Sequence, residues 1–191
     1  MTAENTVHIR IPLQRVGALI GPSGTTKKTI ENQLTVLLDI DGESGSVWIT
    51  PQNKNSDPVT MFRARDIVLA IGRGFAPDKA FRLFHDEVYL GVIDLREIFG
   101  KSDTDISRVK SRVIGKKGRT RQQIEELSGS VLSIYGHTIM IIGNQAQVDV
   151  AREAVHRFIR GDQHKSVYEF LQRKRQELKF EETKLWQETP Y

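Results

Sequence analysis

The spacing of apolar residues changes repeatedly along the chain, and each change predicts an element of secondary structure. A run that alternates apolar and polar residues is typical of a strand, whereas apolar residues three and four positions apart are typical of a helix. A short apolar turn followed by GPSG separates the first strand from the next helix. The first part of the sequence predicts a strand at 7–13, the apolar turn at 16–20 and a helix at 25–34. Two strands follow at 37–41 and 46–50, and a helix follows at 58–71.

The same order of elements returns later, because the sequence repeats at an offset of 94 residues. IGPSGTTKKTIENQLTVLLDIDG aligns with IGKKGRTRQQIEELSGSVLSIYG, and the alignment matches glycines and apolar positions together. This agreement indicates two copies of one module of about 70 residues. In the second copy a polar stretch, GKSDTDISR, lengthens the segment before the GKKG loop. Its predicted strands and last helix lie at residues 88–95, 131–135, 138–142 and 148–159.

Two further segments complete the predicted organisation. A connector between the copies contains a short helix that Asp78 caps after Pro77. A final helix at 163–187 has a partial apolar stripe, which consists of Phe170, Leu171, Leu178 and Trp186. We therefore predict an α+β protein in which each module is a three-stranded antiparallel sheet backed by helices. The predicted limits are 1–73 for the first module, 74–87 for the connector, 88–161 for the second module, and 162–191 for the C-terminal helix and tail.

Composition narrows the class of protein. Of the 191 residues, 38% are hydrophobic and 27% are charged, which is typical of a globular chain that buries a core. The absence of cysteine excludes disulfides, thiol nucleophiles and cysteine-ligated zinc. No stretch approaches the ~18 consecutive apolar residues of a membrane span, and the first ten residues lack the pattern of a signal peptide. We expect a cytoplasmic protein that does not contact a membrane.

Each module carries a GxxG loop between two helical segments. Glycine lets the backbone approach a ligand closely and adopt positive φ. The loop also begins a helix, whose N-terminal N–H groups and dipole favour phosphate oxygens. A single GxxG segment is more often a corner between two helices, but a motif that occurs twice in the same context predicts binding of a phosphate backbone. The two loops consist of Gly21, Pro22, Ser23 and Gly24, and of Gly115, Lys116, Lys117 and Gly118.

In this order of elements the sequence resembles the K-homology (KH) family, and specifically its type I. The resemblance implies that each GxxG loop clamps the backbone of about four single-stranded nucleotides. It also implies that the strand after the loop lines a base pocket, at 37–41 in the first copy and 131–135 in the second. Leu132 and Ile134 would then form the apolar floor of the second pocket.

Longer segments carry a more specific resemblance. GRGFAPDKAFRLF, IDLREIFGKSDTDISRVKSRVIGKKGRTRQQIEEL and YGHTIMIIG resemble the partner-of-NOB proteins, a KH family of small-subunit ribosome biogenesis. The intact first GxxG and the start of the chain near its first strand are similar to archaeal rather than eukaryotic members. The resemblance implies binding near the 3′ end of small-subunit (16S) ribosomal RNA. It implies as partners a NOB-type endonuclease that trims this end and the α subunit of initiation factor two. No cofactor and no small-molecule substrate are expected.

Positive charge is concentrated around the second loop. Residues 108–121 hold seven cations and no acid, and because the whole chain has a net charge of +4, the remaining residues carry −3. Such a dense cluster of like charge favours a polyanionic ligand. The first loop is poorer, because Pro22 and Ser23 replace the lysines and only Lys27 and Lys28 follow. We expect the second copy to be the stronger RNA site, through Arg108, Lys110, Arg112, Lys116, Lys117, Arg119 and Arg121.

Two aromatic residues are candidates for stacking on bases. Trp48 alternates with Val47 and Ile49 in a predicted strand, which favours a place in the core or at a domain interface. Tyr135 ends the second strand of the second copy, where it would either stack on a base or be half-buried.

Enzyme classes fit the sequence less well. GPSGTTKK approaches the phosphate-binding loop G-x-x-x-x-G-K-[ST], but Thr26 replaces the second glycine and Lys28 replaces the hydroxyl that ligates Mg²⁺. Asp103 and Asp105, together with the serine and threonine beside them, are expected to cap a short helix rather than to bind metal. The five histidines show no metal-ligand spacing. We therefore predict a non-catalytic binder of single-stranded RNA. The alternative is a KH-based scaffold that links ribosome-assembly or translation-initiation factors and binds RNA only weakly.

Overall fold

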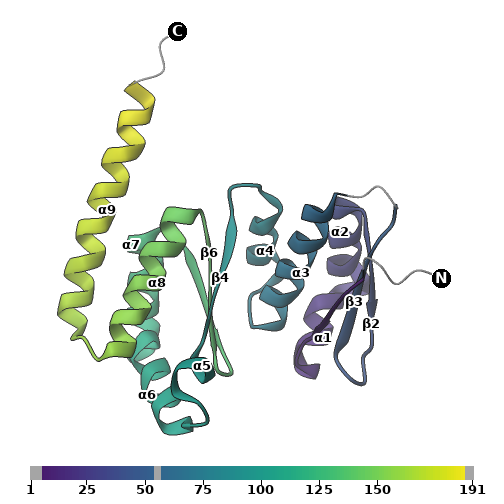
Figure 1. Ribbon diagram of the computed structural model, residues 1–191, viewed down its shortest axis with the longest axis horizontal. Helices are drawn as coiled ribbons and strands as arrows, with labels where there is room; N and C mark the ends of the chain where they lie inside the picture. The colour runs from purple at the N-terminus through teal and green to yellow at the C-terminus, as the bar shows by residue number, and fades with distance from the viewer. Residues whose placement is uncertain (1–5, 54–56, 188–191) are drawn as a thin grey trace. The chain divides into compact units, whose positions relative to one another are not determined.

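The chain is divided into two compact units, the first ending at Leu90 and the second beginning at Gly91. The computed structural model describes residues 6–53 and 57–187, with the side chains of the last helix described as far as Phe180. Each unit contains one three-stranded sheet, and helices cover one face of it (Figure 1). This architecture is the predicted α+β fold.

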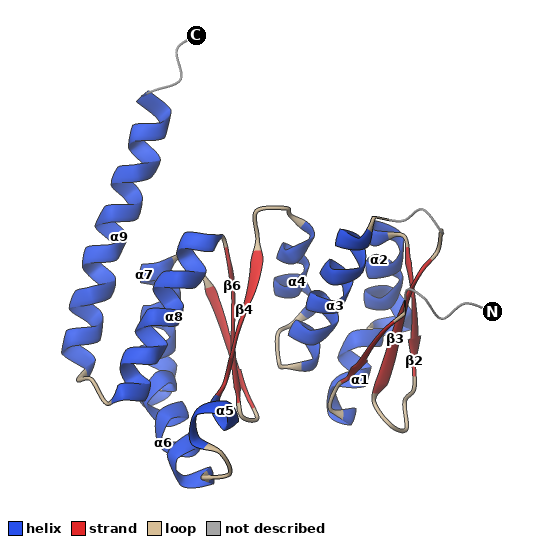
Figure 2. Cartoon of the chain, in the orientation of Figure 1, coloured by secondary structure: helices blue, strands red, loops and turns tan. Residues whose placement is uncertain are grey.

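The first unit has the order strand, helix, helix, strand, strand, helix (Figure 2). Its elements are β1 (Val7–Arg10), α1 (Leu13–Ile20), η1 (Pro22–Gly24), α2 (Thr25–Leu34), β2 (Val36–Ile40), β3 (Ser46–Pro51) and α3 (Pro58–Gly72). All strand pairs are antiparallel and β3 is the central strand, so β2 lies at an edge of the sheet. The Asp57 carboxylate accepts a hydrogen bond from the Val59 N–H and caps α3, as the Asp-Pro pair predicts.

The core of the first unit lies between its sheet and its helices. Leu38 and Ile49 are cross-strand partners in β2 and β3, and both are almost fully buried. Because side chains alternate along a strand, Trp48 lies on the other face of the sheet. It is 36% exposed, and its ring lies 5.2 Å from that of His8, its partner in β1. Trp48 therefore lies outside the core, which excludes the first of the two expected positions, and its place at a domain interface stays a prediction.

The segment predicted as a connector packs on α3. It contains α4 (Pro77–Ala80) and η2 (Phe81–Phe84), and Arg63 of α3 donates a hydrogen bond to the Phe84 carbonyl at 2.6 Å. The expected cap is wrong, because Ala76 is the N-cap of α4 and Asp78 lies inside its first turn. Pro77 occupies the first helical position, so the helix begins one residue before the aspartate.

The second unit repeats the order and adds two helices (Figure 2). Its elements are β4 (Tyr89–Asp94), α5 (Leu95–Phe99), α6 (Asp103–Ile114), η3 (Lys116–Gly118), α7 (Arg119–Ser128), β5 (Val131–Tyr135), β6 (Thr138–Gly143), α8 (Gln145–Arg160) and α9 (His164–Gln187). The sheet order is β4-β6-β5, so β5 corresponds to β2 and also lies at an edge.

The last helix, α9, is part of the packed second unit. It lies along α7 and α8 (Figure 1), and Phe170 and Leu171 of its apolar stripe are buried in the same core as Phe158. Leu178 packs against this core and is partly buried. The side chain of Trp186 lies outside the described residues. No helix within the described ranges is both long enough and apolar enough to cross a membrane.

Three elements, α1, β4 and α6, differ in length from the predicted pattern. The apolar turn expected at 16–20 is a helix of eight residues, α1, which begins directly after Pro12. The opening strand of the second unit ends at Asp94, because this residue caps α5 by accepting a hydrogen bond from the Arg96 N–H. Ser102 caps α6 by accepting from the Asp105 N–H, as expected of a serine in this polar stretch. Asp103 and Asp105 lie in the first turn of the helix, so neither is its N-cap. The helix that Ser102 caps is longer than expected, at 12 residues.

A reciprocal capping box at the start of α8 generates the first prediction. The Asn144 side chain accepts from the Gln147 N–H at 2.9 Å, and the Gln147 side chain accepts from the Asn144 N–H at 3.0 Å. We expect Asn144→Ala to lower the free energy of unfolding by about 1 kcal/mol. The exposed neighbour Gln145→Ala is the control and should change it by less than about 0.5 kcal/mol. Urea denaturation followed by circular dichroism measures both, and equal effects would contradict the capping argument.

Candidate nucleic-acid interface

The two GxxG loops have the same backbone conformation. The φ angles are 74°, 50° and 76° at the first, third and fourth positions of the first loop, and 70°, 54° and 77° at these positions of the second. Positive φ is uncommon for residues other than glycine, yet Ser23 and Lys117 both adopt it at the third position. The conformation leaves the two middle residues of each loop exposed. The predicted correspondence between the two copies therefore extends to the backbone.

The first glycine of each loop is required by the residue that packs beneath it. A Cβ atom at Gly115 would lie 2.1 Å from Thr120 Oγ1, and one at Gly21 would lie 2.2 Å from Thr26 Oγ1. Both threonines are buried. A side chain at this position would therefore push the loop away from its helix.

The last glycine of the second loop faces open space instead. A Cβ atom at Gly118 would have no described atom within 4 Å, so a ligand can approach the backbone there. Gly118 is also the N-cap of α7, and no side chain caps this helix end. The first-turn N–H groups of α7 and the helix dipole together favour an anion next to the loop.

A glutamate of the helix after each loop holds the edge strand of its sheet. Glu31 Oε1 accepts a hydrogen bond from the Leu38 N–H at 2.9 Å, and Glu125 Oε1 accepts from the Leu132 N–H at 2.8 Å. The two glutamates match in the repeat alignment, and this match was the available signal for a role that sequence reasoning missed. The bond fixes the distance between the loop-bearing helix and the strand predicted to line the base pocket.

The two residues predicted to form the apolar floor of the second base pocket, Leu132 and Ile134, differ in exposure. Leu132 is only 4% exposed, whereas Ile134 is half-buried and packs against the edge of the core. Ile134 therefore presents more surface to a ligand than Leu132. The N–H of Ile134, two residues further along the edge strand, points in the same direction as that of Leu132. Ile114, the residue before the loop, is 36% exposed and adds apolar surface next to the loop.

The seven cations of residues 108–121 divide into two groups. Arg108 pairs with Asp105 at 3.0 Å, Arg121 lies 3.7 Å from Glu125, and the Arg112 guanidinium binds backbone carbonyls. The other four have no hydrogen-bond or ion-pair partner among the residues that the structure describes, and they are Lys110, Lys116, Lys117 and Arg119. These four are the cations most available to an anionic ligand.

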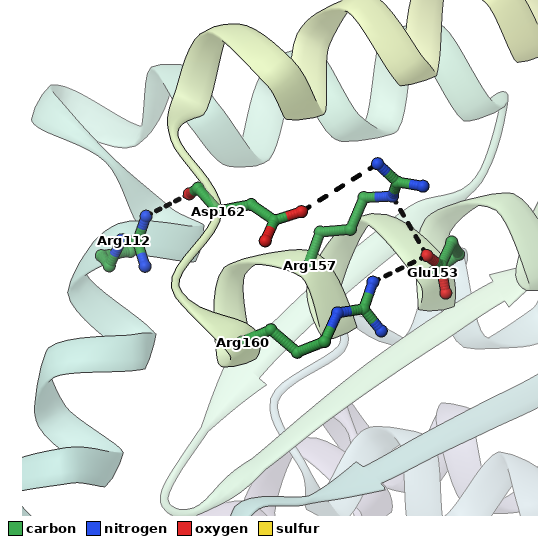
Figure 3. Close-up of polar contacts among 5 residues, drawn as sticks. All are labelled: Arg112, Glu153, Arg157, Arg160 and Asp162. Carbon is green, nitrogen blue, oxygen red and sulfur yellow. Dashed lines mark hydrogen bonds and ion pairs between the residues drawn. The ribbon is translucent and has the colours of Figure 1, made fainter.

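Arg112 connects α6 to the corner between α8 and α9 (Figure 3). Its Nη1 donates to the Phe158 carbonyl at 3.0 Å, and its Nη2 donates to the Asp162 carbonyl. The side chain is therefore occupied at least partly in holding the C-terminal end of α8. Arg15 has the equivalent role in the first unit, at the C-terminal end of α3. It donates to the carbonyls of Ile71 and Phe75 at 2.8 and 2.7 Å.

Charged side chains stabilise the same corner (Figure 3). Arg157 and Arg160 donate to Glu153 Oε1 at 3.0 and 2.9 Å, and Arg157 also lies 4.0 Å from the Asp162 carboxylate. Burial tends to raise the pKa of Glu153, but the hydrogen bond from Arg160 and the two positive charges outweigh it and lower the pKa below its ordinary value. Glu153 therefore remains ionised at neutral pH and keeps the turn into α9 in place.

The helix α9 contacts the two helices that flank the second loop, α6 and α7. Tyr168 Oη lies 3.0 Å from Thr120 Oγ1, the hydroxyl that packs under Gly115. His164 Nε2 lies 3.3 Å from the Arg112 carbonyl oxygen. Sequence reasoning did not connect α9 to the loop, because the repeat alignment has no counterpart of this helix and contains no signal for the contact.

The first unit has fewer cations at its loop. Lys27 lies 3.9 Å from Glu31, as Arg121 lies near Glu125 in the second unit, while Lys28 is exposed. Pro22 and Ser23 are exposed but carry no charge. The same loop conformation is thus present in both units, and the available charge is concentrated in the second.

Other candidate chemistry adds little. Tyr135 at the end of β5 is half-buried, which is one of the two expected positions. Within residues 6–53 and 57–187, no group of three or more histidine and carboxylate side chains is arranged to hold a metal ion.

Comparison with known proteins identifies the family of the chain. The family model for the eukaryotic type KH domain (KH domain type I), from the second KH domain of PNO1, matches residues 89–176. A KH domain-containing protein of Methanocaldococcus jannaschii is 47% identical over 178 residues, which is 93% of this chain and 78% of that protein.

Two more relatives extend the comparison. In the crystal structure of the a/eIF2alpha–aDim2p–rRNA complex from Pyrococcus horikoshii, the similar chain is 46% identical, with a TM-score of 0.83 over 90% of this chain and 94% of that one. The pre-rRNA-processing protein pno1 of Schizosaccharomyces pombe is 25% identical over 84% of this chain and 65% of that protein. The chain therefore belongs to the partner-of-NOB family of KH-domain proteins, among its archaeal members.

The position of Arg112 generates the second prediction. Because its guanidinium binds two backbone carbonyls, Arg112→Ala should lower the free energy of unfolding by about 2 kcal/mol. Arg119→Ala is the matched control, since this exposed arginine has no partner among the described residues, and it should change stability by less than about 0.5 kcal/mol. Urea denaturation measures both. If the two variants are equally stable, Arg112 does not hold the α8–α9 corner.

Proposed function

We propose that the second unit binds single-stranded RNA through the GKKG loop and the surface between α7 and β5. The observation that carries the proposal is a set of four cations, in the GKKG loop and the helices that flank it, that have no partner among the described residues. The last glycine of this loop is open to a ligand. Phosphates of the strand lie on Lys116, Lys117, Lys110 and Arg119. Bases lie toward β5, where Ile134 supplies apolar contact and the strand edge supplies backbone hydrogen-bonding groups. Arg108, Arg112 and Arg121 flank this surface.

The ligand we propose is small-subunit ribosomal RNA near its 3′ end, bound during ribosome biogenesis in the cytoplasm. Support comes from the pre-rRNA-processing relative in Schizosaccharomyces pombe and from the similar chain crystallised with rRNA from Pyrococcus horikoshii. That complex also contains a/eIF2alpha, which supports the α subunit of initiation factor two as a partner. The chain acts without catalysis and presents the RNA end to a NOB-type endonuclease, as the family resemblance implies.

The first unit has a weaker share of RNA binding in this proposal. Gly21, Pro22, Ser23 and Gly24 form its clamp, and Lys27 and Lys28 supply its nearby charge. The outer face of its sheet carries exposed apolar surface at Leu37 and Trp48. This surface favours protein contacts and keeps a scaffold that binds other factors as the second candidate function.

The two loops should differ in their effect on RNA binding. We expect Lys116→Asp with Lys117→Asp to weaken binding of a short single-stranded RNA about a hundredfold, because two charge-assisted contacts are lost at roughly 1.4 kcal/mol each. Pro22→Asp with Ser23→Asp is the matched change in the first loop and should weaken binding less. Fluorescence anisotropy measures both affinities.

The fold should survive in both variants, since aspartate tolerates the positive φ of the third loop position. Circular dichroism controls for this. Unchanged affinity after substitution of the lysines would remove the GKKG loop from the RNA site, and a larger loss from the first loop would reverse the order of the two units.

RNA binding should also depend strongly on salt. Log affinity falls against log salt with a slope of roughly −0.7 per neutralised phosphate, so four contacts give a slope of roughly −3. Replacing Lys110 and Arg119 by alanine should make the slope shallower by roughly 1.4 units, at about 0.7 for each lost phosphate contact. Preference for cognate over scrambled RNA should persist, because these side chains position the backbone. Substitution of Ile134 should reduce that preference instead.

The control for the salt series is a double alanine variant at Arg152 and Arg173, two partly exposed arginines of the same unit that pair with Asp149 and Glu177. Its slope should match that of the unaltered protein. A slope near zero for the unaltered protein would mean that the basic residues do not meet RNA, and the scaffold function would then be favoured.

A further inference from the structure

A hollow of about 510 Å³ lies beside the GKKG loop, on the side of the loop that α9 covers. This volume is within the range of pockets that hold small ligands, about 300–1,000 Å³. Thr120 and Arg121 are neighbours in α7, yet the Thr120 hydroxyl contacts α9 while Arg121 lies by Glu125, which binds β5. The loop therefore separates two surfaces. The hollow is lined by Ser111, Arg112, Gly115, Lys116, Arg119, Thr120, His164 and Tyr168.

The lining combines cations with aromatic rings. Lys116 and Arg119 are exposed and have no partner among the described residues, so they can receive an anion. The rings of His164 and Tyr168 are half-buried with centroids 6.2 Å apart, and His164 also lies against Phe158 at 4.9 Å. Positive charge beside aromatic rings suits a nucleotide, since phosphate binds the cations and a base stacks on the rings.

We propose that this hollow holds one further nucleotide of the bound RNA, adjacent in the strand to those clamped by the GKKG loop. Its phosphate lies on Lys116 and Arg119, and its base lies against Tyr168 and His164. The inference rests on the proposed function and extends the RNA site onto α9. Continuity supports it, because Gly115 and Lys116 belong both to the clamp and to the hollow.

The contact between Tyr168 and Thr120 means that α9 also supports the GKKG loop. Thr120 lies directly beneath Gly115, so the helix that forms one wall of the hollow also supports the loop. The first unit has no such helix in the repeat alignment, and we expect the further nucleotide only in the second unit.

Oligonucleotides of different length test the proposal. The full chain is titrated with a four-nucleotide RNA and with the same RNA extended at either end by one nucleotide, with or without its base. We expect extension by a complete nucleotide at one end to raise affinity about tenfold, which corresponds to about 1.4 kcal/mol. The extension that lacks a base should gain less, because stacking on the rings is missing.

Substitutions at two serines locate the gain. Ser111 and Ser166 are both exposed, but only Ser111 lines the hollow. Ser111→Glu places bulk and negative charge at the hollow and should abolish the tenfold gain. Ser166→Glu makes the same chemical change on the first turn of α9 outside the hollow and should preserve the gain. Ser111→Leu and Ser166→Leu repeat the comparison with bulk alone, because a glutamate at Ser111 also repels the phosphates held by Lys116 and Arg119. The two leucine variants should bind the four-nucleotide RNA with the same affinity and differ only in the gain on extension, and thermal unfolding confirms that all four variants are folded.

The outcomes separate this inference from the proposed function. Failure of every RNA to bind the unaltered protein overturns the proposed function. Normal binding of the four-nucleotide RNA with no gain on extension, or equal effects of substitution at the two serines, overturns the inference alone. A photoreactive base at the extending position gives an independent measurement. Its crosslink should map by mass spectrometry to residues 164–168, and a crosslink confined to β5 would also overturn the inference.

Discussion

The packing of a buried threonine hydroxyl under the first glycine of each GxxG loop is the constraint on which the candidate site depends. Any side chain at Gly115 would collide with Thr120, so the chain can make the tight turn between α6 and α7 only with glycine there. The turn places Lys116 and Lys117 outward and leaves the N-terminal N–H groups of α7 uncapped. Charge and backbone donors thus meet at one place because of steric exclusion beneath the loop.

The two units share this constraint and differ in what surrounds it. Both have the threonine, the positive-φ third residue and the glutamate that binds the edge strand. Only the second loop has lysines in its middle and the α9 helix beneath it, through the contact of Tyr168 with Thr120. Duplication of a module explains the shared geometry. The added charge and helix are what make the second unit the stronger candidate for RNA.

The repeat made most of the fold predictable, because glycines and apolar residues that match in both copies predict the same backbone conformation in each. The predicted limits of α2 and β5 are those of the structure, since each is bounded by strong local signals. The sequence could not decide whether Trp48 belongs to the core, because alternation in a strand gives two faces and does not say which one packs on helices. The support of the loop by Tyr168 could not be predicted, as it joins residues 48 positions apart whose pairing only tertiary packing decides.

Counting cations along the sequence overstates how many are available to RNA. Residues 108–121 hold seven, yet arginines account for all three that have partners within the unit. The planar guanidinium of Arg112 can donate to two carbonyls at once, which a lysine ammonium does less well, so arginine suits the α8–α9 corner. Both lysines of the loop are instead exposed, and neither has a partner among the described residues. The charge that a polyanion meets is therefore set by which side chains the fold has already engaged. The loop lysines remain available because no side chain in the described part of the unit binds them.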